Sequence, residues 1–438
     1  MRKLFVLFLV GSLGLAAGCS GGGGGGQTPV GVPTGGTNNV LSIAVDGGPT
    51  ATQSGGTIYE NGVFASVTIC APGSTSNCVT VDHLLVDTGS VGVRVLQSAV
   101  ASLNLPGING SGGPLYDCVQ FGDGSFVWGP VDNANVTLAG ETASNIPIHI
   151  ISSSTANIPS TCSGINENTQ SSLGANGILG VGLEPFDCGL ACDVNGGLTS
   201  PPVPVYYTCP SSGCAPAFAS CGAECNDSTG VQQVTNPVVA FSVDNNGVIV
   251  ELPALPSSGT AATVTGSLVF GIGTESNNQL TNANVFTVAC ADNFDTTFEG
   301  QSFAVDPSSC ASGVFGGFID SGSNALYFFD ANNVLPDCAA SSVGADFYCP
   351  TSLMSLSAVN QDPNTLFTET TNFSVDNATN LFTANPTNAA FSNLAGPQSS
   401  VSAGFDWGLP FFYNRHVYNA IDGQAVPSGL ANPPWYAY

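Results

Sequence analysis

The sequence predicts a mostly β protein with two lobes and a cleft between them. Apolar runs of about four to eight residues alternate with Gly, Pro, Asn and Ser, and helical periodicity is scarce. An apolar run that leads into Asp, a hydroxyl residue, Gly and Ser occurs twice, at Leu84–Ser90 and Gly317–Ser323. The 438 residues suffice for two lobes of about 200 residues, each with its own core. We therefore expect an N-terminal lobe over residues 40–240 and a C-terminal lobe over residues 241–438.

Residues 1–19 have the pattern of a secretory signal peptide. Arg2 and Lys3 precede an apolar run from Leu4 to Val10, which is too short to span a membrane. The segment ends in Leu15–Cys19, which resembles the cleavage site of bacterial lipoproteins, where lipid is attached to the cysteine. We therefore expect a protein anchored through Cys19 in the bacterial cell envelope, at the outer membrane, facing the periplasm or the cell surface. An ordinary cleaved signal is the alternative.

Residues 20–39 predict a flexible tether. The segment consists mostly of Gly, Pro, Thr and other small or polar residues and includes a run of six glycines. A Gly-rich chain of this length spans roughly 25 Å. No later segment has 18 consecutive apolar residues, so we expect contact with a membrane through the lipid anchor only.

The charge of the chain is strongly one-sided, with four Lys and Arg residues against 30 Asp and Glu residues. Removal of the signal peptide would leave Arg94 and Arg415 as the only basic residues, which makes nucleic acid and anionic lipid surfaces poor partners. Because self-repulsion falls as carboxylates are protonated, we expect a protein that is more stable in acid. The alternative is that scarce Lys and Arg only protect the chain from proteases that cut after those residues.

The 15 cysteines fit an oxidising compartment, and 14 remain for seven disulfides once Cys19 is set aside. Proximity along the chain predicts four pairs: Cys70–Cys78, Cys118–Cys162, Cys290–Cys310 and Cys338–Cys349. The other six lie within residues 185–227, which we interpret as a disulfide-stapled surface insertion: Cys188, Cys192, Cys209, Cys214, Cys221 and Cys225. Zinc binding is the alternative for this stretch, although the chain has only three histidines.

Strand patterns lead into both Asp loops. Val40–Val45 predicts a short strand, and Val63–Cys70 with Cys78–Val86 predicts a hairpin that delivers Asp87 to its loop. In the second half, the apolar segments Phe303–Val305 and Val314–Ile319 lead to the second loop.

The two Asp loops place a carboxylate at the end of an apolar strand, which is costly unless the charge is hydrogen-bonded or paired. One such loop alone is equally well explained as a tight turn, since Asp and Ser bond to their own backbone and Gly adopts positive φ. Two copies, with Asp87 and Asp320, indicate carboxyl groups that face each other. In these residues the chain resembles the bilobal pepsin-like aspartic peptidases, in which each lobe contributes one such loop.

The resemblance implies that Asp87 and Asp320 form a catalytic pair that shares one proton and activates a water molecule. It implies supporting roles for the residues that follow each Asp: Thr88, Gly89, Ser90, Ser321, Gly322 and Ser323. The hydroxyl groups of Thr88 and Ser321 would brace the loops, Ser90 and Ser323 would bond to the carboxylates, and the glycines would let the backbones approach closely.

Three further segments resemble parts of this family. Cys118–Gly129 resembles the flap, although any surface hairpin would share its pattern, and its tip would consist of Phe121, Gly122, Asp123, Gly124 and Ser125. Asn176–Gly182 resembles the strand that packs behind the first Asp loop. In the second lobe, Gly266–Gly273 resembles a strand just inside the lobe and Trp407–Asn414 resembles its closing strand.

The chain departs from the family pattern at three positions. Phe121 stands where the flap normally has Tyr, and the usual Trp partner of that Tyr is replaced near Arg94. We expect Arg94 to be solvated, because an Arg close to the pair would lower the pKa of its carboxyl groups. Leu409 stands where the closing strand usually has Asp.

These observations predict an aspartic endopeptidase-like protein that acts on a polypeptide, in a bacterial lipoprotein family of unestablished function. We expect a monomer that needs no cofactor and no metal, since His83, His149 and His416 occur singly and no phosphate-binding loop is present. The alternative is a pepsin-like binding or structural protein that keeps both Asp loops but has lost turnover.

Overall fold

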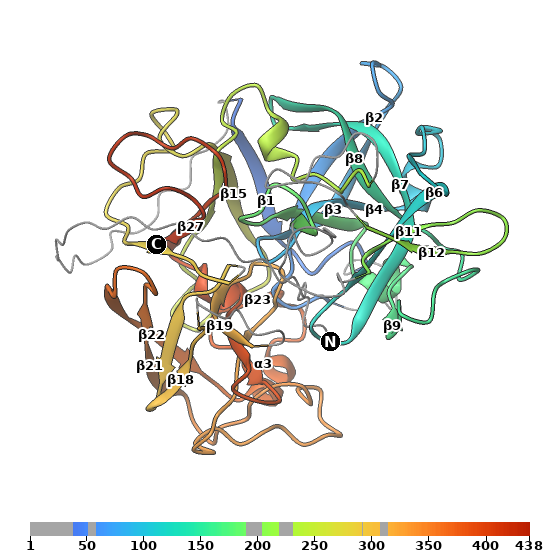
Figure 1. Ribbon diagram of the computed structural model, residues 1–438. Coiled ribbons are helices and arrows are strands. Elements are labelled where there is room, and N and C mark those ends of the chain that lie inside the picture. The colour runs from blue at the N-terminus through green and yellow to red at the C-terminus, as the bar shows by residue number, and fades with distance from the viewer. Residues whose placement is uncertain (1–37, 51–57, 190–203, 219–230, 291, 307–313) are drawn as a thin grey trace.

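The computed structural model describes residues 38–50, 58–189, 204–218, 231–290, 292–306 and 314–438. Strands dominate this part of the chain, so the prediction of a mostly β protein is confirmed (Figure 1). Its α-helices are short: α1 (Gln97–Val100), α2 (Gln170–Leu173) and α3 (Ala378–Ala384). None of the helices in this part is long and apolar enough to cross a membrane.

The N-terminal half, blue to green in Figure 1, consists mainly of antiparallel hairpins. β2 pairs with β3 and β7, and β7 pairs in turn with β6 and β8. The elements of this half are β1 (Val40–Val45), β2 (Val63–Cys70), β3 (Cys78–Asp87), β4 (Val91–Leu96), β5 (Asn109–Gly110), β6 (Gly113–Gln120), β7 (Ser125–Leu138), β8 (Glu141–Ile151), β9 (Ile165–Asn166), β10 (Gly177–Val181), β11 (Tyr206–Thr208), β12 (Ala215–Ala217) and the 3-10 helix η2 (Val238–Ala240).

The C-terminal half, yellow to red, contains two four-stranded sheets. β17 and β21 lie at the centre of one, between β18 and β22, and the other contains β19, β20, β24 and β25. Its elements are β13 (Gly247–Leu252), β14 (Thr260–Ala261), β15 (Val264–Phe270), β16 (Val285–Thr287), β17 (Asp295–Phe298), β18 (Gln301–Phe303), β19 (Phe315–Ile319), β20 (Leu326–Phe328), β21 (Met354–Gln361), β22 (Thr368–Val375), β23 (Ala390–Phe391), β24 (Ala395–Pro397), β25 (Ala403–Trp407), the 3-10 helix η3 (Leu409–Phe411), β26 (Arg415–Ala420) and β27 (Trp435–Ala437).

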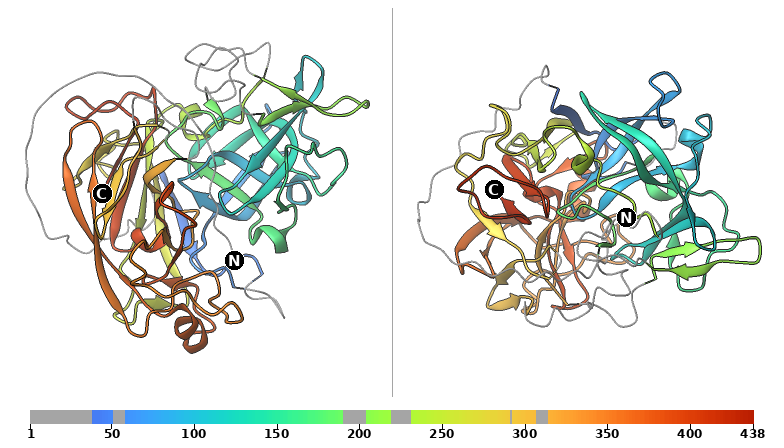
Figure 2. Two further views of the ribbon diagram at one scale, coloured as in Figure 1. Left: turned by 60° about the horizontal axis from the view of Figure 1, so that its bottom comes forward. Right: turned by 45° about the horizontal axis from the view of Figure 1, so that its top comes forward.

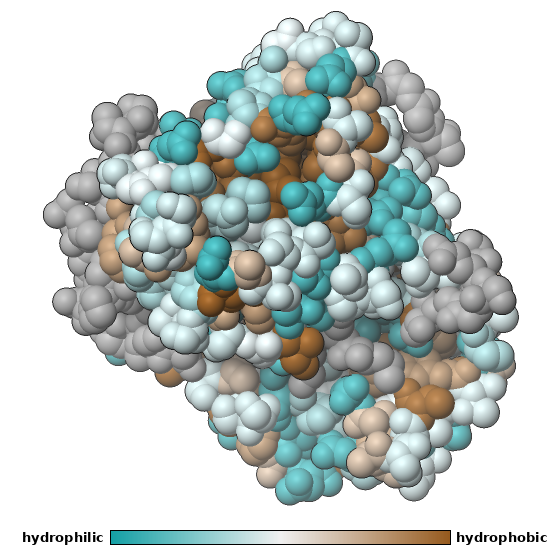
Figure 3. Space-filling model, turned by 90° about the vertical axis from the view of Figure 1, so that its right-hand side faces the viewer, coloured by the Kyte–Doolittle hydropathy of each residue, from teal (hydrophilic) through white to brown (hydrophobic). Residues whose placement is uncertain are grey.

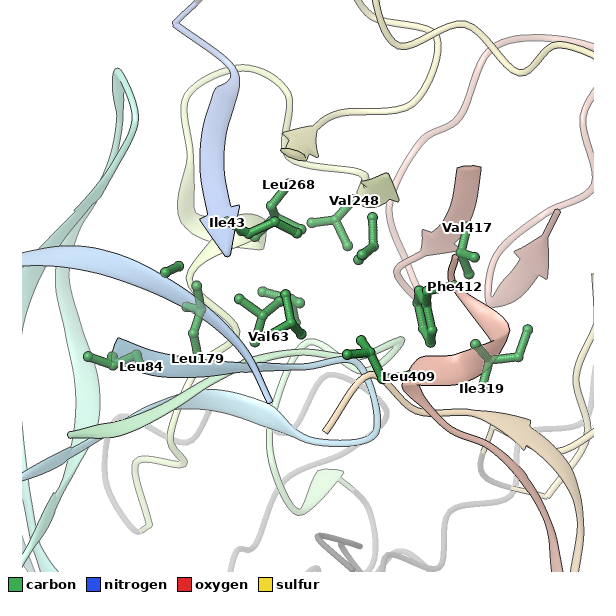
Figure 4. Packing of buried hydrophobic residues seen from close by; sticks show 14 of the residues in the cluster. Ile43, Val63, Leu84, Leu179, Val248, Leu268, Ile319, Leu409, Phe412 and Val417 are labelled. Atoms are coloured by element: carbon green, nitrogen blue, oxygen red, sulfur yellow. The ribbon is translucent and has the colours of Figure 1, made fainter. Parts of the chain in front are cut away.

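The two halves lie side by side and are joined by backbone pairing (Figure 2). β1 pairs with β2 of its own half and, from Val40↔Val269 to Val45↔Val264, with β15 of the other half. Asn61 adds a buried side-chain link, since its Nδ2 donates to the carbonyl oxygens of Asn324 and Phe391 at 2.9 and 2.8 Å. The main core is shared as well. Figure 4 shows buried side chains of both halves in one continuous cluster, among them Ile43, Val63 and Leu84 with Val248, Ile319 and Phe412.

The surroundings of the Asp loops repeat between the halves. β3 leads into the first loop and β4 leaves it, and β10 runs parallel to β3 and antiparallel to β4. β19 leads into the second loop and β20 leaves it, and β25 runs parallel to β19 and antiparallel to β20. The predicted strand behind the first loop is therefore confirmed as β10. The expected closing strand Trp407–Asn414 is wrong in part: β25 ends at Trp407 and η3 follows, because Pro410 has no N–H to donate to a sheet.

Disulfides bridge the described residues at four places: Cys70–Cys78, Cys118–Cys162, Cys209–Cys214 and Cys338–Cys349. Three of these pairs were predicted and are confirmed, and the fourth falls within the predicted Cys-rich group. Cys290 is also disulfide-bonded, and its predicted partner Cys310 lies outside the described residues, as do Cys192, Cys221 and Cys225.

The described parts of residues 185–227 are more than a surface insertion, which corrects our interpretation. β11 pairs with β6, and Tyr206 and Tyr207 on β11 are fully buried. Asp187 is buried as well, at 1% exposure. The Tyr207 ring packs edge-on against Trp128, so this segment covers apolar residues of β6 and β7. Figure 3 shows the face of the molecule on this side, where polar residues surround smaller apolar patches.

Several carboxyl groups are partly buried, where the ionised form is disfavoured. Burial raises the pKa of Asp132 to about 6. Burial and the nearby charge of Asp422 raise the pKa of Asp292 to about 7, and burial with these two neighbours raises the pKa of Glu184 well above its usual range. A carboxyl group whose pKa is raised by folding stabilises the folded state while it is protonated, and this contribution is lost as the pH rises through the folded pKa.

We predict that the melting temperature falls between about pH 4, the unfolded pKa of a carboxyl group, and about pH 7. The fall should be a few °C, since about 1 kcal/mol changes the melting temperature of a chain of about 400 residues by about 1 °C. In calorimetry, the melting temperature of the variant Asp292→Asn should fall less steeply with pH than that of the wild type. As a control, Glu275→Gln should leave this slope unchanged, because Glu275 is exposed. A melting temperature that rises steadily over this interval would contradict the prediction.

Candidate active site

Each Asp of the two loops lies at the end of a buried strand. Asp87 is the last residue of β3 and Asp320 follows β19, and both are 1% exposed. The carboxylates have matching partners. The Gly89 N–H donates to Oδ1 of Asp87 at 2.9 Å and the Gly322 N–H donates to Oδ1 of Asp320 at 2.7 Å.

The hydroxyl groups at the loop ends bind the second oxygen of each carboxyl group. Ser90 Oγ donates to Oδ2 of Asp87 at 2.5 Å, and Ser323 Oγ donates to Oδ2 of Asp320 at 2.9 Å. Each carboxyl group is thus held by one backbone N–H and one hydroxyl group of its own loop. Both bonds favour the ionised form and fix the orientation of the carboxyl plane.

Crossed hydrogen bonds join the two loops. The Thr88 N–H donates to Oγ of Ser321 at 3.1 Å, and the Ser321 N–H donates to Oγ of Thr88 at 2.9 Å. Each hydroxyl group then donates across to the opposite strand, Thr88 to the carbonyl of Ile319 at 3.2 Å and Ser321 to the carbonyl of Val86 at 2.7 Å. Both side chains are fully buried, so the four bonds are shielded from competition by water.

The crossed bonds bring the two carboxyl groups so close that each affects the pKa of the other. Glycine is required on both sides of this contact. A methyl group on Gly89 would lie 2.6 Å from Cγ of Asp320, and one on Gly322 would lie 2.7 Å from Cγ of Asp87.

The two carboxyl groups differ in their tendency to ionise. The pKa of Asp320 lies well above its ordinary value because the group is buried and because the charges of Asp87 and Asp406 are nearby. Burial also raises the pKa of Asp87, but the hydrogen bond from Ser90, the contact with Asp320, the Gly89 N–H and the charge of Arg94 favour its ionised form. Carboxyl groups in contact cannot both ionise readily, so the pair holds one proton over a wide pH range.

The predicted flap is a hairpin of β6 and β7. At its tip the Phe121 N–H donates to the carbonyl of Ser125 at 2.8 Å, and Oδ1 of Asp123 accepts the Ser125 N–H at 2.8 Å. Gly122 and Gly124 are exposed, and Gly124 has a φ of +82° that favours glycine. Phe121 is buried in a cluster with Leu85, so its ring packs against the strand that carries Asp87. The charge of Asp123 contributes to the raised pKa of Tyr327, which places the tip toward the second half.

Arg94 is fully buried, which corrects the expectation that it is solvated. Nη1 of Arg94 donates to Asp117 at 2.5 Å, and Nη2 donates to Asp187 at 2.9 Å and to the carbonyl of Val91 at 3.2 Å. His149 Nδ1 lies 3.0 Å from Nη1. Arg94 is buried because two carboxyl groups from distant segments compensate its charge.

Two carboxyl groups against one Arg would leave an excess negative charge in this cluster. Burial raises the pKa of Asp117 well above its usual range and raises that of Asp187, against the opposing charge of Arg94. Burial and Arg94 lower the pKa of His149, so its ring is neutral. The cluster therefore holds one proton between its carboxyl groups, and Tyr206 Oη donates to Asp187 at 2.5 Å.

Sequence reasoning missed Asp117, Asp187 and Asp406. Asp406 is 1% exposed on β25 between Phe405 and Trp407, and nothing in that apolar segment marks it as a neighbour of Asp320. Leu409, at the position where Asp was expected, is fully buried in the main core.

Comparison with known proteins gives the family. Residues 35–438 match the model of a family described as "Protein of unknown function (DUF3443)". The chain belongs to this family. This DUF3443 chain is also similar to the crystal structure of the aspartic proteinase from Irpex lacteus, with 13% sequence identity and a TM-score of 0.47, over 91% of this chain and 96% of that one. No curated protein matches the sequence. The geometry of the two Asp loops, and not this similarity, carries the functional argument below.

We predict that Thr88→Val destabilises the protein by about 2–4 kcal/mol, because it leaves the buried N–H of Ser321 and the carbonyl of Ile319 without their partner. Thr88→Ser keeps the hydroxyl group and should cost about 1 kcal/mol for the lost methyl group. Urea-induced unfolding of both variants measures the difference. Equal losses in the two variants would show that the crossed bonds contribute nothing measurable.

Proposed function

We propose that the protein is an aspartic-type endopeptidase that hydrolyses peptide bonds in polypeptide substrates. The observation that carries the proposal is the close approach of Asp87 and Asp320, two buried carboxyl groups from different halves with matching partners in their own loops. Four hydrogen bonds made by Thr88 and Ser321 and two glycines allow the pair to form. A simple tight turn would need neither these bonds between the halves nor the close approach of the two loops.

The pair has the groups that peptide hydrolysis needs. The ionised carboxylate can accept a proton from a water molecule, and the protonated carboxyl group can donate a hydrogen bond to the carbonyl oxygen on which negative charge develops. The same proton can then pass to the leaving amine. Because this chemistry requires the singly protonated pair, we propose that activity is favoured in acid.

The flap supports an extended substrate. Its exposed tip at Gly122 and Gly124 offers backbone groups without side chains, and the charge of Asp123 acts on Tyr327 of the second half. An extended peptide can pair with such backbone groups as an additional strand. We propose that the protein acts as a monomer, since each half supplies one Asp to the same site.

The second candidate is a pepsin-like binding or structural protein without turnover. Phe121 favours it, because this flap residue has no hydroxyl group to offer a substrate and its ring is buried in the cluster that includes Leu85. In this case the two Asp loops would serve only to hold the halves together.

Cleavage of an unfolded protein between about pH 3 and 6 distinguishes the two candidates. We predict cleavage by the wild type, inhibition by pepstatin, and a loss of about 10²-fold to 10⁴-fold in Asp87→Asn and in Asp320→Asn, since each removes one of the two proton-transfer groups. Asp82→Asn, an exposed position, serves as the matched control and should keep full activity. Absence of cleavage by the wild type with any substrate would leave the binding protein as the function.

We also propose that Cys19 is lipidated and that the protein is anchored in the cell envelope, on the basis of the sequence pattern around this residue. We predict that the wild type enters the detergent phase in Triton X-114 partitioning and carries labelled palmitate. Cys19→Ser should remove the label. A labelled Cys19→Ser protein, or an unlabelled wild type, would point to an ordinary signal peptide.

A further inference from the structure

The repeat of the two Asp loops allows their surroundings to be compared position by position. Arg94 follows Asp87 by as many residues as Tyr327 follows Asp320, and both lie on the strand that leaves the loop. Ile178 on β10 is paired with Leu85 and with Arg94. Asp406 on β25 is paired in the same way with Phe318 and with Tyr327.

Arg94 therefore corresponds to Tyr327, and Ile178 corresponds to Asp406. All four side chains are at most 1% exposed. The half that carries Asp87 thus has a buried positive charge and an aliphatic residue where the half that carries Asp320 has a phenol and a carboxyl group. The hydrogen bonds within the two loops match, but the charges behind the loops have opposite sign.

Strand geometry places Asp406 beside Asp320. Residues paired across a ladder point to the same face of the sheet, so Asp406 shares a face with Phe318, and Asp320 follows Phe318 by two residues. The Asp320 N–H donates to the carbonyl of Trp407 at 3.2 Å, which keeps the two strands in register at this point. Asp406 is accordingly one of the charges that act on Asp320.

Asp320 is thus acted on by two other carboxyl groups, Asp87 on the opposite loop and Asp406 on the neighbouring strand. Ionised Asp320 would be repelled by the charges of both groups, so the repulsion is smallest when Asp320 carries the proton. Arg94 also favours a proton on Asp320, since the charge of Arg94 favours the ionised form of Asp87.

The remaining groups near the pair do not reverse this preference. The loop hydrogen bonds favour ionisation of both Asp residues, and the Ser90 bond to Asp87, at 2.5 Å, is shorter than the Ser323 bond to Asp320, at 2.9 Å. Tyr327 and, on β27, Tyr436 stay neutral because burial raises their pKa well above the usual range. Asp117 and Asp187 share one proton, so they compensate the charge of Arg94 and leave the cluster without net negative charge.

We propose that Arg94 and Asp406 are positioning residues that hold the shared proton on Asp320 and leave Asp87 ionised. The catalytic consequence of this proton placement rests on the proposed function. Asp87 would then be the base that accepts a proton from water, and Asp320 would be the acid that donates a hydrogen bond to the substrate carbonyl. The placement of the proton itself does not depend on turnover.

The titration of the two carboxyl groups tests the proposal in the whole protein labelled with ¹³C at Asp Cγ. Signals are assigned by their loss in Asp87→Asn and in Asp320→Asn. We expect the Asp320 signal to remain that of a protonated carboxyl group at pH values where the Asp87 signal is ionised. Asp406→Asn, which is nearly isosteric, should lower the pH at which Asp320 ionises by about one unit or more.

A second variant probes the other half. Arg94→Met combined with Asp187→Asn removes one positive and one negative partner together, and Asp117, which loses its bond to Arg94, then holds the proton of the cluster. This variant should raise the pH at which Asp87 ionises by about one unit or more. Glu141→Gln is the matched control, since Glu141 is a buried carboxyl group of β8 that takes no part in the pair, and both titrations should stay unchanged.

If the wild type cleaves peptides, Asp406→Asn should also move the alkaline limb of the pH profile of kcat/KM toward acid, which a purely structural role would not do. If the wild type does not cleave, the proposed function fails, while the titrations still decide the placement of the proton. A protonated Asp87 beside an ionised Asp320, or an unchanged Asp320 titration in folded Asp406→Asn, would overturn the inference.

Discussion

Four hydrogen bonds made by Thr88 and Ser321, two with each other and two with the opposite strands, hold the site together, and the rest of the arrangement depends on them. Each hydroxyl group accepts an N–H from the opposite loop and donates to a carbonyl of the opposite strand, so no buried polar group at this point is left without a partner. The bonds fix the distance between β3 and β19, and with it the contact of the two carboxyl groups. Shared backbone pairing through β1 and a common core then keep the two halves from moving apart.

The sequence was sufficient to predict the parts of the site that are local. The strand end, the Asp and the residues that hold its carboxyl group lie within seven consecutive positions, so the segment Leu84–Ser90 contains the whole loop. The repetition of this pattern at Gly317–Ser323 indicates the partner loop. The disulfides of neighbouring cysteines were predictable for the same reason. The buried charges were not: Arg94 is compensated by Asp117 and Asp187, which lie 23 and 93 residues away, and no pattern links them. An Arg with no charged residue near it in the sequence is expected to be exposed to solvent, and only the fold shows that Arg94 is buried.

The two loops show that geometry and electrostatics can change independently in a repeated structure. The bonds within each loop are nearly the same, yet the strands behind them carry Arg94 in one half and Asp406 in the other. Because charges act over several ångströms in a poorly polarisable interior, a substitution in the layer behind a loop alters how readily its carboxyl group ionises without moving it. Such a layer can adapt a site to its conditions while the loop itself stays constant.

The pairing of β1 with β15 has a consequence for how the chain reaches this structure. About 220 residues separate the end of β1 from the start of its partner strand, so the first strand to be synthesised is among the last to be completed. Contacts between such distant segments slow folding. Until β15 is present, the unpaired edge of β1 can pair with strands of other chains. The order of synthesis and the order of assembly therefore oppose each other, and the nascent polypeptide is most prone to aggregation before its second half has emerged.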